Sequence, residues 1–169
     1  MGQNRRAEIA MTPSEIDEFV AAHRVATLAT LGPTGMPHLT AMWFGVLPTG
    51  PDGAAEVWFE TKAKSQKAVN LRRDSRVSVL VEDGDTYDTL RGVAIEGRGE
   101  VSDDPDVMFP VGVSVYERYH GPYTPEMRDA VTAMLSKRVV VRVVPQRTRS
   151  WDHRKLGLPA MPVAGSTAG

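Results

Sequence analysis

A short basic segment carries the residue types in this sequence that best suit ligand chemistry. Residues 61–76 hold six Lys or Arg side chains and one Asp, a local net charge of +5, whereas the whole chain has a formal net charge of −1. The segment predicts a strand end followed by a helix over residues 62–73. The expected first turn of this helix is rich in cations and hydroxyls and has no carboxylate, its residues being Thr61, Lys62, Lys64, Ser65 and Lys67.

A phosphate is the natural ligand of such a helix start. The dipole and free N–H groups at a helix N-terminus normally attract Asp or Glu, and without these the positive charge remains for an anion from outside. Ammonium and hydroxyl groups add charge-assisted hydrogen bonds to phosphate oxygens. A solvated, lysine-rich helix face is the alternative interpretation.

The strand expected beside this site has a mixed polar and apolar face. In the period of a strand, His38 and Thr40 share a face with Met42 and Phe44. Such a face suits a planar heteroaromatic ligand, although core packing with two tolerated polar residues is favoured when this segment is considered alone. The candidate ligand contacts here are Pro37, His38, Thr40, Ala41, Met42 and Trp43.

A third candidate segment lies near the C-terminus, where Trp151 and Asp152 are followed by Arg154. An aromatic anchor flanked by cations suits an interface that meets an anionic ligand. Alternatively, Trp151 packs on its own barrel. Three tyrosines near His120 could line a pocket, but packing of an inserted helix is favoured for them: Tyr116, Tyr119 and Tyr123.

The elements that must position these residues are mostly strands. Thr12 and Glu15 form a capping box that predicts one opening helix, and strands are expected over 24–31, 37–47, 56–61, 76–81, 92–101 and 138–144. The first three are expected to form an antiparallel meander. Helical stretches are expected from Asp103, interrupted near Pro110, and from Thr124. About six strands with inserted helices predict an α+β, mainly β, six-stranded antiparallel barrel.

Composition limits the protein to a few classes. The chain has 169 residues, 41% of them hydrophobic and 24% charged, which predicts one folded domain over residues 12–156 with flexible tails at 1–11 and 157–169. The absence of cysteine excludes disulfides and thiolate metal sites, and the histidines show no metal spacing. We expect a cytoplasmic protein without a membrane span. Binding to nucleic acid is disfavoured because the basic run contains no aromatic residue.

Three stretches resemble one known superfamily. They are ATLATLGPTGMPHLTAMWF, FETKAKSQKAVNLRRDSRVSVLVE and GVAIEGRGEV, and the most specific element is Ser65-x-Lys67-x-x-Asn70-Leu71 after a strand. They are similar to the flavin and deazaflavin split-barrel proteins related to pyridoxamine 5'-phosphate oxidase, most closely to the actinobacterial branch that uses coenzyme F420. The resemblance covers most of the chain and implies the FMN-binding type of split β-barrel.

The resemblance also implies roles for the candidate residues. Ser65 and Lys67 match the ligands of the cofactor phosphate, with Thr61, Lys62 and Lys64 as helpers, and 37–43 matches the strand along the cofactor ring. The family forms homodimers with the cofactor at the subunit interface. The C-terminal segment of the second chain closes over the cofactor, and the residues at that position here are Trp151, Asp152 and Arg154.

The implied activity is an F420H2-dependent reductase that transfers a hydride to a small electron-poor acceptor. Oxidation of pyridoxamine phosphate is disfavoured, because the strand matching that enzyme's flavin-phosphate motif, His38 to Met42, has no Lys or Arg and the Arg-x-His pair is missing. A broad cationic rim suits the acidic tail of F420. An FMN-dependent oxidoreductase and a non-catalytic binder of F420, FMN or haem remain alternatives. No catalytic side chain is required, although His38 could donate a proton if it is not structural.

Overall fold

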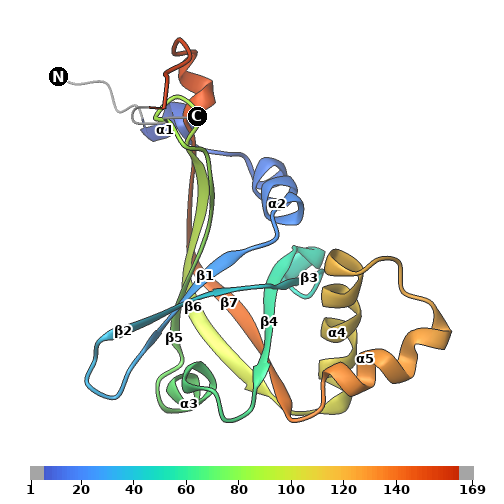
Figure 1. The fold of residues 1–169 in the computed structure, drawn as a ribbon. Helices are drawn as coiled ribbons and strands as arrows, with labels where there is room; N and C mark the ends of the chain where they lie inside the picture. The colour runs from blue at the N-terminus through green and yellow to red at the C-terminus, as the bar shows by residue number, and fades with distance from the viewer. Residues whose placement is uncertain (1–5, 164–169) are drawn as a thin grey trace, which may run out of the picture.

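The structure, a computed structural model, describes residues 6–163 and is built on one curled antiparallel sheet (Figure 1). Its strands follow the order β2-β1-β5-β6-β7-β4-β3, and every neighbouring pair is antiparallel. The sheet has seven strands where six were expected: β1 (Ala26–Leu31), β2 (Pro37–Met42), β3 (Gly45–Leu47), β4 (Glu56–Lys62), β5 (Arg76–Asp83), β6 (Arg91–Ser102) and β7 (Arg138–Asp152). The curl and the attached helices give the mainly β, half-barrel arrangement of a split barrel.

The extra strand arises because the expected strand 37–47 breaks at Trp43–Phe44. β2 pairs with β1, whereas β3 pairs with β4 at the opposite edge of the sheet. Both antiparallel pairings of the expected meander are present, but its middle strand is divided between the two edges, so the three strands are not neighbours in the sheet. Curling of the sheet brings its two edges close enough for consecutive strands to occupy both.

The helices surround the sheet at separate places. They are α1 (Arg6–Ile9), α2 (Pro13–Ala22), α3 (Gln66–Arg73), α4 (Pro105–Tyr119) and α5 (Arg128–Met134), with short 3-10 turns at η1 (Pro51–Gly53), η2 (Pro125–Met127) and η3 (His153–Leu156). The Thr12/Glu15 capping box is confirmed at the start of α2. Of the expected tails, 1–5 and 164–169 lie outside the described residues.

Two helix predictions need correction. α3 begins at Gln66 and not at Lys62, because Lys62 still pairs with Arg138 in the sheet and Ser65 caps the helix. α4 continues through Pro110 without interruption. Its buried stripe, which includes Val111 and Val115, packs on α5 and β3 and offsets the backbone hydrogen bond that proline cannot make.

The core has two parts that share strand β4. Phe59 points into the barrel with Phe44 and Val141. The preceding side chain on β4, Trp58, points to the other face and packs under α4 and α5. Neighbouring β4 residues therefore alternate between the barrel interior and the helical layer. The groove described below opens where this strand ends.

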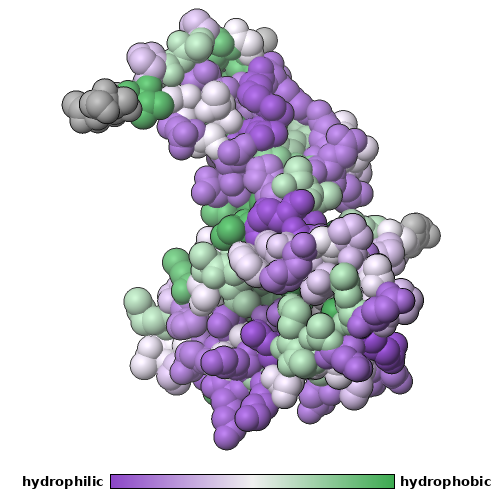
Figure 2. Space-filling view, turned by 45° about the vertical axis from the view of Figure 1, so that its right-hand side comes forward, coloured by the Kyte–Doolittle hydropathy of each residue, from purple (hydrophilic) through white to green (hydrophobic). Residues whose placement is uncertain are grey.

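Strands β5, β6 and β7 continue beyond the barrel as a long arm that ends at α1 and η3 (Figure 1). Figure 2 shows the arm and the barrel as two masses joined at a narrow waist. β7 runs to Asp152 instead of ending at residue 144, and a register shift after Glu96 bends the pairing with β6. Gly97 sits at this shift because a Cβ there would collide with the Val144 carbonyl. The half-exposed strand expected over 92–101 therefore lacks a side chain where the partner backbone approaches.

Candidate functional site

A groove of about 710 Å³ opens where β4, the start of α3, the β2–β3 corner and the end of α4 meet. Eight of the fourteen predicted site residues line it: Thr40, Ala41, Met42, Trp43, Thr61, Lys62, Ser65 and Lys67. These residues come from two stretches that are some twenty positions apart in the sequence. The fold brings both predicted halves of the site to one cavity.

The start of α3 provides hydrogen-bond donors on one side of the groove. Ser65 caps the helix by accepting from the Ala68 N–H at 3.4 Å, and its hydroxyl lies 3.1 Å from that of Thr61. The N–H groups of Gln66 and Lys67 belong to the first turn, which has no intrahelical acceptors for them. The first turn contains no acidic residue. We call Thr61, Ser65 and Lys67 with these N–H groups the phosphate cradle, because the donor set fits a phosphate monoester.

Lys67 supplies the positive charge of this cradle. Its side chain is half-buried, and burial lowers the pKa of its ammonium. A buried cation without a carboxylate partner gains the most from an anion, since the anion compensates the lost hydration. An occupied cradle is therefore expected to restore the pKa of Lys67.

The rest of the basic segment does not line the groove. Lys64 is exposed in the turn before α3. Arg72 donates to the Ala63 carbonyl at 2.7 Å, Arg73 donates to the Leu31 carbonyl, and Arg76 forms an ion pair with Asp74 at 2.7 Å. Arg72 and Arg73 therefore stabilise local backbone and Arg76 is paired with Asp74, whereas Lys62 and Lys67 line the groove.

The opposite wall of the groove is aromatic. Trp43 is 52% exposed and stacks on Tyr119 with ring centroids 4.3 Å apart and planes 7° from parallel. The Tyr119 hydroxyl donates to the Arg24 carbonyl at 2.6 Å and accepts from the Phe44 N–H at 2.9 Å. The tyrosine therefore fixes the platform on which Trp43 lies, in agreement with the packing role favoured for the tyrosines.

The other two β2 candidates lie away from the groove. Pro37 pairs with Leu31 and lines a separate depression between β1 and β5. His38 lies opposite Thr30 and is half-buried, and its Nδ1 is buried without a hydrogen-bond partner among residues 6–163. His38 is therefore not among the residues that line the groove.

Several groove residues were not predicted. They are Glu60, Val115, His120, Met134 and Arg138. Glu60 could have been found, because strand alternation puts it on the same face as Lys62. The other four come from the helical insertion and β7, and only tertiary structure brings them here.

Glu60 is the acidic residue of the groove wall. One carboxylate oxygen, Oε1, lies 3.8 Å from the Arg138 guanidinium, and the side chain is 11% exposed. Burial raises the pKa of this carboxyl, while the charges of Arg138 and His120 act in the opposite direction with smaller effect. The groove therefore combines lysines at the cradle with a carboxyl whose pKa is raised by burial.

The predicted C-terminal residues lie at the far end of β7 from Arg138. Asp152 is buried and pairs with Arg154 at 2.5 Å, and this hydrogen-bonded pair lowers the pKa of Asp152. The Trp151 ring lies against Gly92 of β6, where a Cβ would overlap it. Within one chain, these residues and the groove are at opposite ends of the molecule.

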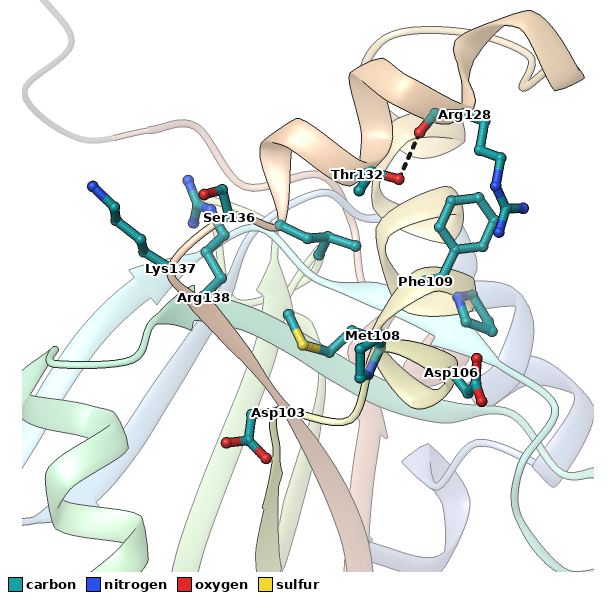
Figure 3. Close-up of a pocket in the computed structure, with 12 residues that line it drawn as sticks. Asp103, Asp106, Met108, Phe109, Arg128, Thr132, Ser136, Lys137 and Arg138 are labelled. Atoms are coloured by element: carbon teal, nitrogen blue, oxygen red, sulfur yellow. Dashed lines mark hydrogen bonds between the residues drawn. The ribbon is translucent and has the colours of Figure 1, made fainter.

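A second cavity of about 520 Å³ lies between α4 and α5 (Figure 3). Two of its polar groups are already in contact with neighbours: the Arg128 guanidinium lies 4.5 Å from the Phe109 ring centroid, and the Thr132 hydroxyl donates to the Arg128 carbonyl at 2.8 Å. Lys137 points away from it into solvent in Figure 3. This cavity has no converging set of free donors comparable with the phosphate cradle.

Comparison with known proteins places the chain among relatives of the same fold. The family model described as Pyridoxamine 5'-phosphate oxidase matches residues 12–152. The crystal structure of the conserved hypothetical protein Rv2991 from Mycobacterium tuberculosis is 63% identical with a TM-score of 0.89, covering 96% of this chain and 98% of that one. A structure titled F420 Reductase is 27% identical with a TM-score of 0.54, covering 78% and 94%.

A third structure shows how widely the fold is used. The haem storage protein HutZ from Vibrio cholerae is 16% identical with a TM-score of 0.59, covering 79% of this chain and 89% of that one, and it shares the fold alone. No curated protein matches the chain. Within residues 6–163, no helix has the length and apolar character needed to cross a membrane.

Proposed function

Because the chain belongs to the pyridoxamine 5'-phosphate oxidase family, we propose that it is a reductase that uses coenzyme F420 to reduce a small electron-poor organic acceptor. The observation that carries the proposal is the phosphate cradle beside the Trp43 platform in a single groove. A cation-and-hydroxyl site next to an aromatic wall matches a cofactor that has a phosphate and a planar ring. When bound, reduced F420 would supply the hydride, and the protein would supply binding, orientation and exclusion of water.

The proposed cofactor contacts come from two elements. Ser65, Thr61 and Lys67 would hold the phosphate, with Lys62 beside them. Strand β2 is at one edge of the sheet, so every second backbone N–H and C=O along it has no strand partner. These groups, near Thr40 and Met42, would hydrogen-bond the polar edge of the ring.

F420 is preferred to FMN for two reasons. The strand β2 offers no Lys or Arg for a flavin phosphate, and a structure titled F420 Reductase is among the relatives with 27% identity. An FMN-dependent oxidoreductase of the same fold is the alternative, since the cradle itself would accept the phosphate of either cofactor.

We also propose that two chains complete the site. Trp151, Asp152 and Arg154 lie far from the groove of their own chain, as they would if they served the groove of a partner. The β1–β2 hairpin and α3 carry exposed apolar side chains, with Met36 69% and Leu39 65% exposed. Pairing of two copies would cover such side chains and bring each arm to the partner's groove.

Fluorescence titration separates the cofactors directly. Protein purified without added cofactor is titrated against F420 and, in parallel, FMN, and then assayed for F420H2 oxidation with a panel of enones, nitro compounds and quinones. We expect quenching of F420 fluorescence at micromolar protein, and oxidation of F420H2 that depends on an acceptor. Tight FMN binding with no F420 binding would overturn the proposal in favour of the FMN-dependent alternative. F420 binding without oxidation of F420H2 by any acceptor would indicate a non-catalytic F420-binding protein.

A further inference from the structure

We propose that the carboxyl of Glu60 is the proton donor of this groove, a role that rests on the reductase function proposed above and that selects acceptors with a polarised C=C or C=N bond. Glu60 lies on β4 two residues before Lys62 and lines the groove with Lys67 and Trp43. It is the one acidic side chain among the described residues that line this groove. Among the described groove residues, Glu60 is therefore the carboxyl that could meet an acceptor bound there.

The two oxygens of Glu60 have unequal surroundings. Oε1 faces Arg138, whereas Oε2 is buried and makes no hydrogen bond within the described part of the chain. A carboxylate with one oxygen buried and unpaired is costly, because that oxygen has lost its water without gaining a donor. A proton on the carboxyl removes the charge and turns the group into a donor that can serve a ligand.

The neighbouring cations do not cancel this preference. Arg138 donates from Nε to the Met134 carbonyl at 2.8 Å, which holds its guanidinium so that Nη1 stays 3.8 Å from Glu60. His120 faces the same groove from the end of α4, and Lys62 and Lys67 line it from β4 and α3. Burial outweighs the charges of Arg138 and His120 and raises the pKa of Glu60.

The proton completes a two-electron reduction. A hydride delivered to one end of the polarised double bond forms a C–H bond and pushes the π electron pair to the other end. The atom at that end takes the proton from the Glu60 O–H, and the Glu60 carboxylate is reprotonated from water. The acceptor gains two electrons and two hydrogens, while the reduced cofactor loses a hydride and releases a proton to solvent.

The test compares Glu60→Gln with Glu82→Gln, which makes the same carboxyl-to-amide change at an exposed β5 position outside the groove. Infrared difference spectra between wild-type protein and each variant, recorded without cofactor at pH 7, report a protonated carboxyl through its C=O stretch. We expect this band to be lost in Glu60→Gln and unchanged in Glu82→Gln. Absence of a Glu60-dependent band overturns the inference, whichever cofactor the protein binds.

Kinetics test the proton transfer itself. General acids contribute about 10²–10⁴-fold to rates, so Glu60→Gln should lower kcat with an enone by about 100-fold while F420 affinity stays within twofold of wild type. The wild-type kcat should fall as pH rises through the pKa of Glu60, and the variant should lose this dependence. A Glu60→Gln enzyme with kcat within twofold of wild type overturns the inference even if the infrared band is present. Failure of wild-type protein to bind F420 would overturn the proposed function instead, and the infrared result would still decide whether Glu60 holds a proton.

Discussion

Replacing Lys67 with Met tests the phosphate cradle while leaving the rest of the groove in place. Methionine keeps most of the apolar stem and removes the ammonium. Lys67 would make a charge-assisted hydrogen bond to the phosphate, and such bonds are worth about 1.5–3 kcal/mol. We therefore expect the Kd for F420 to rise by about 10- to 150-fold. The hydroxyls of Thr61 and Ser65 remain 3.1 Å apart, so binding should weaken without being abolished.

The same substitution should not weaken the folded protein. Burial lowers the pKa of Lys67 in the folded state, which means that folding disfavours its charged form at neutral pH. The resulting loss of stability is complete below the lowered folded-state pKa of Lys67. It disappears as pH rises from that value to the unfolded-state pKa of lysine. Lys67→Met removes the cost, so the free energy of unfolding of cofactor-free protein should stay equal or increase.

Lys64→Met is the matched control, because Lys64 is exposed in the neighbouring turn and does not line the groove. Both variants lose one positive charge. Affinity for F420 is measured by fluorescence quenching at low and high salt, which separates contact with the phosphate from the general field of the basic segment. Equal weakening in both variants would refute the cradle in favour of a diffuse charge effect, and unchanged affinity in Lys67→Met would show that the phosphate lies elsewhere.

Three further substitutions test contacts that stabilise the fold. Arg142→Leu leaves the buried Glu56 carboxylate without the two hydrogen bonds that it accepts from Arg142 at 2.7 and 3.1 Å, so urea denaturation should show a loss of about 3 kcal/mol; a loss below about 1 kcal/mol would contradict this. Gly97→Ala puts a methyl group into the Val144 carbonyl, and we expect insoluble protein or a thermal midpoint at least several degrees lower; wild-type stability would show that the bulge can shift. Tyr119→Phe removes the hydroxyl that joins two backbone groups but keeps the ring, so stability should fall by about 1–3 kcal/mol with F420 affinity nearly unchanged; an equally large loss of affinity would make the hydroxyl a ligand contact.

The sequence reveals most of the cradle because its signals are local. A strand end, a capping serine and a cationic first turn without acids are all contained within residues 61–67. The exact helix start was missed, since the pairing of Lys62 with Arg138 depends on a strand some seventy residues later. The basic segment also overstates the number of cations that line the groove, because Arg72 and Arg73 donate to backbone carbonyls that no local pattern reveals.

The arm and the break in strand 37–47 were harder to predict. Residues 145–152 are mostly polar and lack the apolar alternation that identifies a half-buried strand, yet they pair with β6 through backbone hydrogen bonds. The break at Trp43–Phe44 contains no glycine or proline, and Gly45, which follows it, already belongs to β3. It depends on closure of the sheet, a property of all seven strands together.

The short link between β2 and β3 limits how the groove can move. Trp43 and Phe44 alone join the two edge strands of the sheet, so Met42 and Gly45 are separated by three peptide units and cannot be more than about 11 Å apart. Phe44 is fully buried, and Tyr119 holds its N–H, so the link is fixed at its centre as well as at its ends. The barrel therefore cannot spread at this corner to admit a ligand. This side of the groove is preorganised, so the entropy cost of ordering the ring-binding edge on binding is small. Any adjustment on binding must come from the end of α4, from α5 or from a second chain.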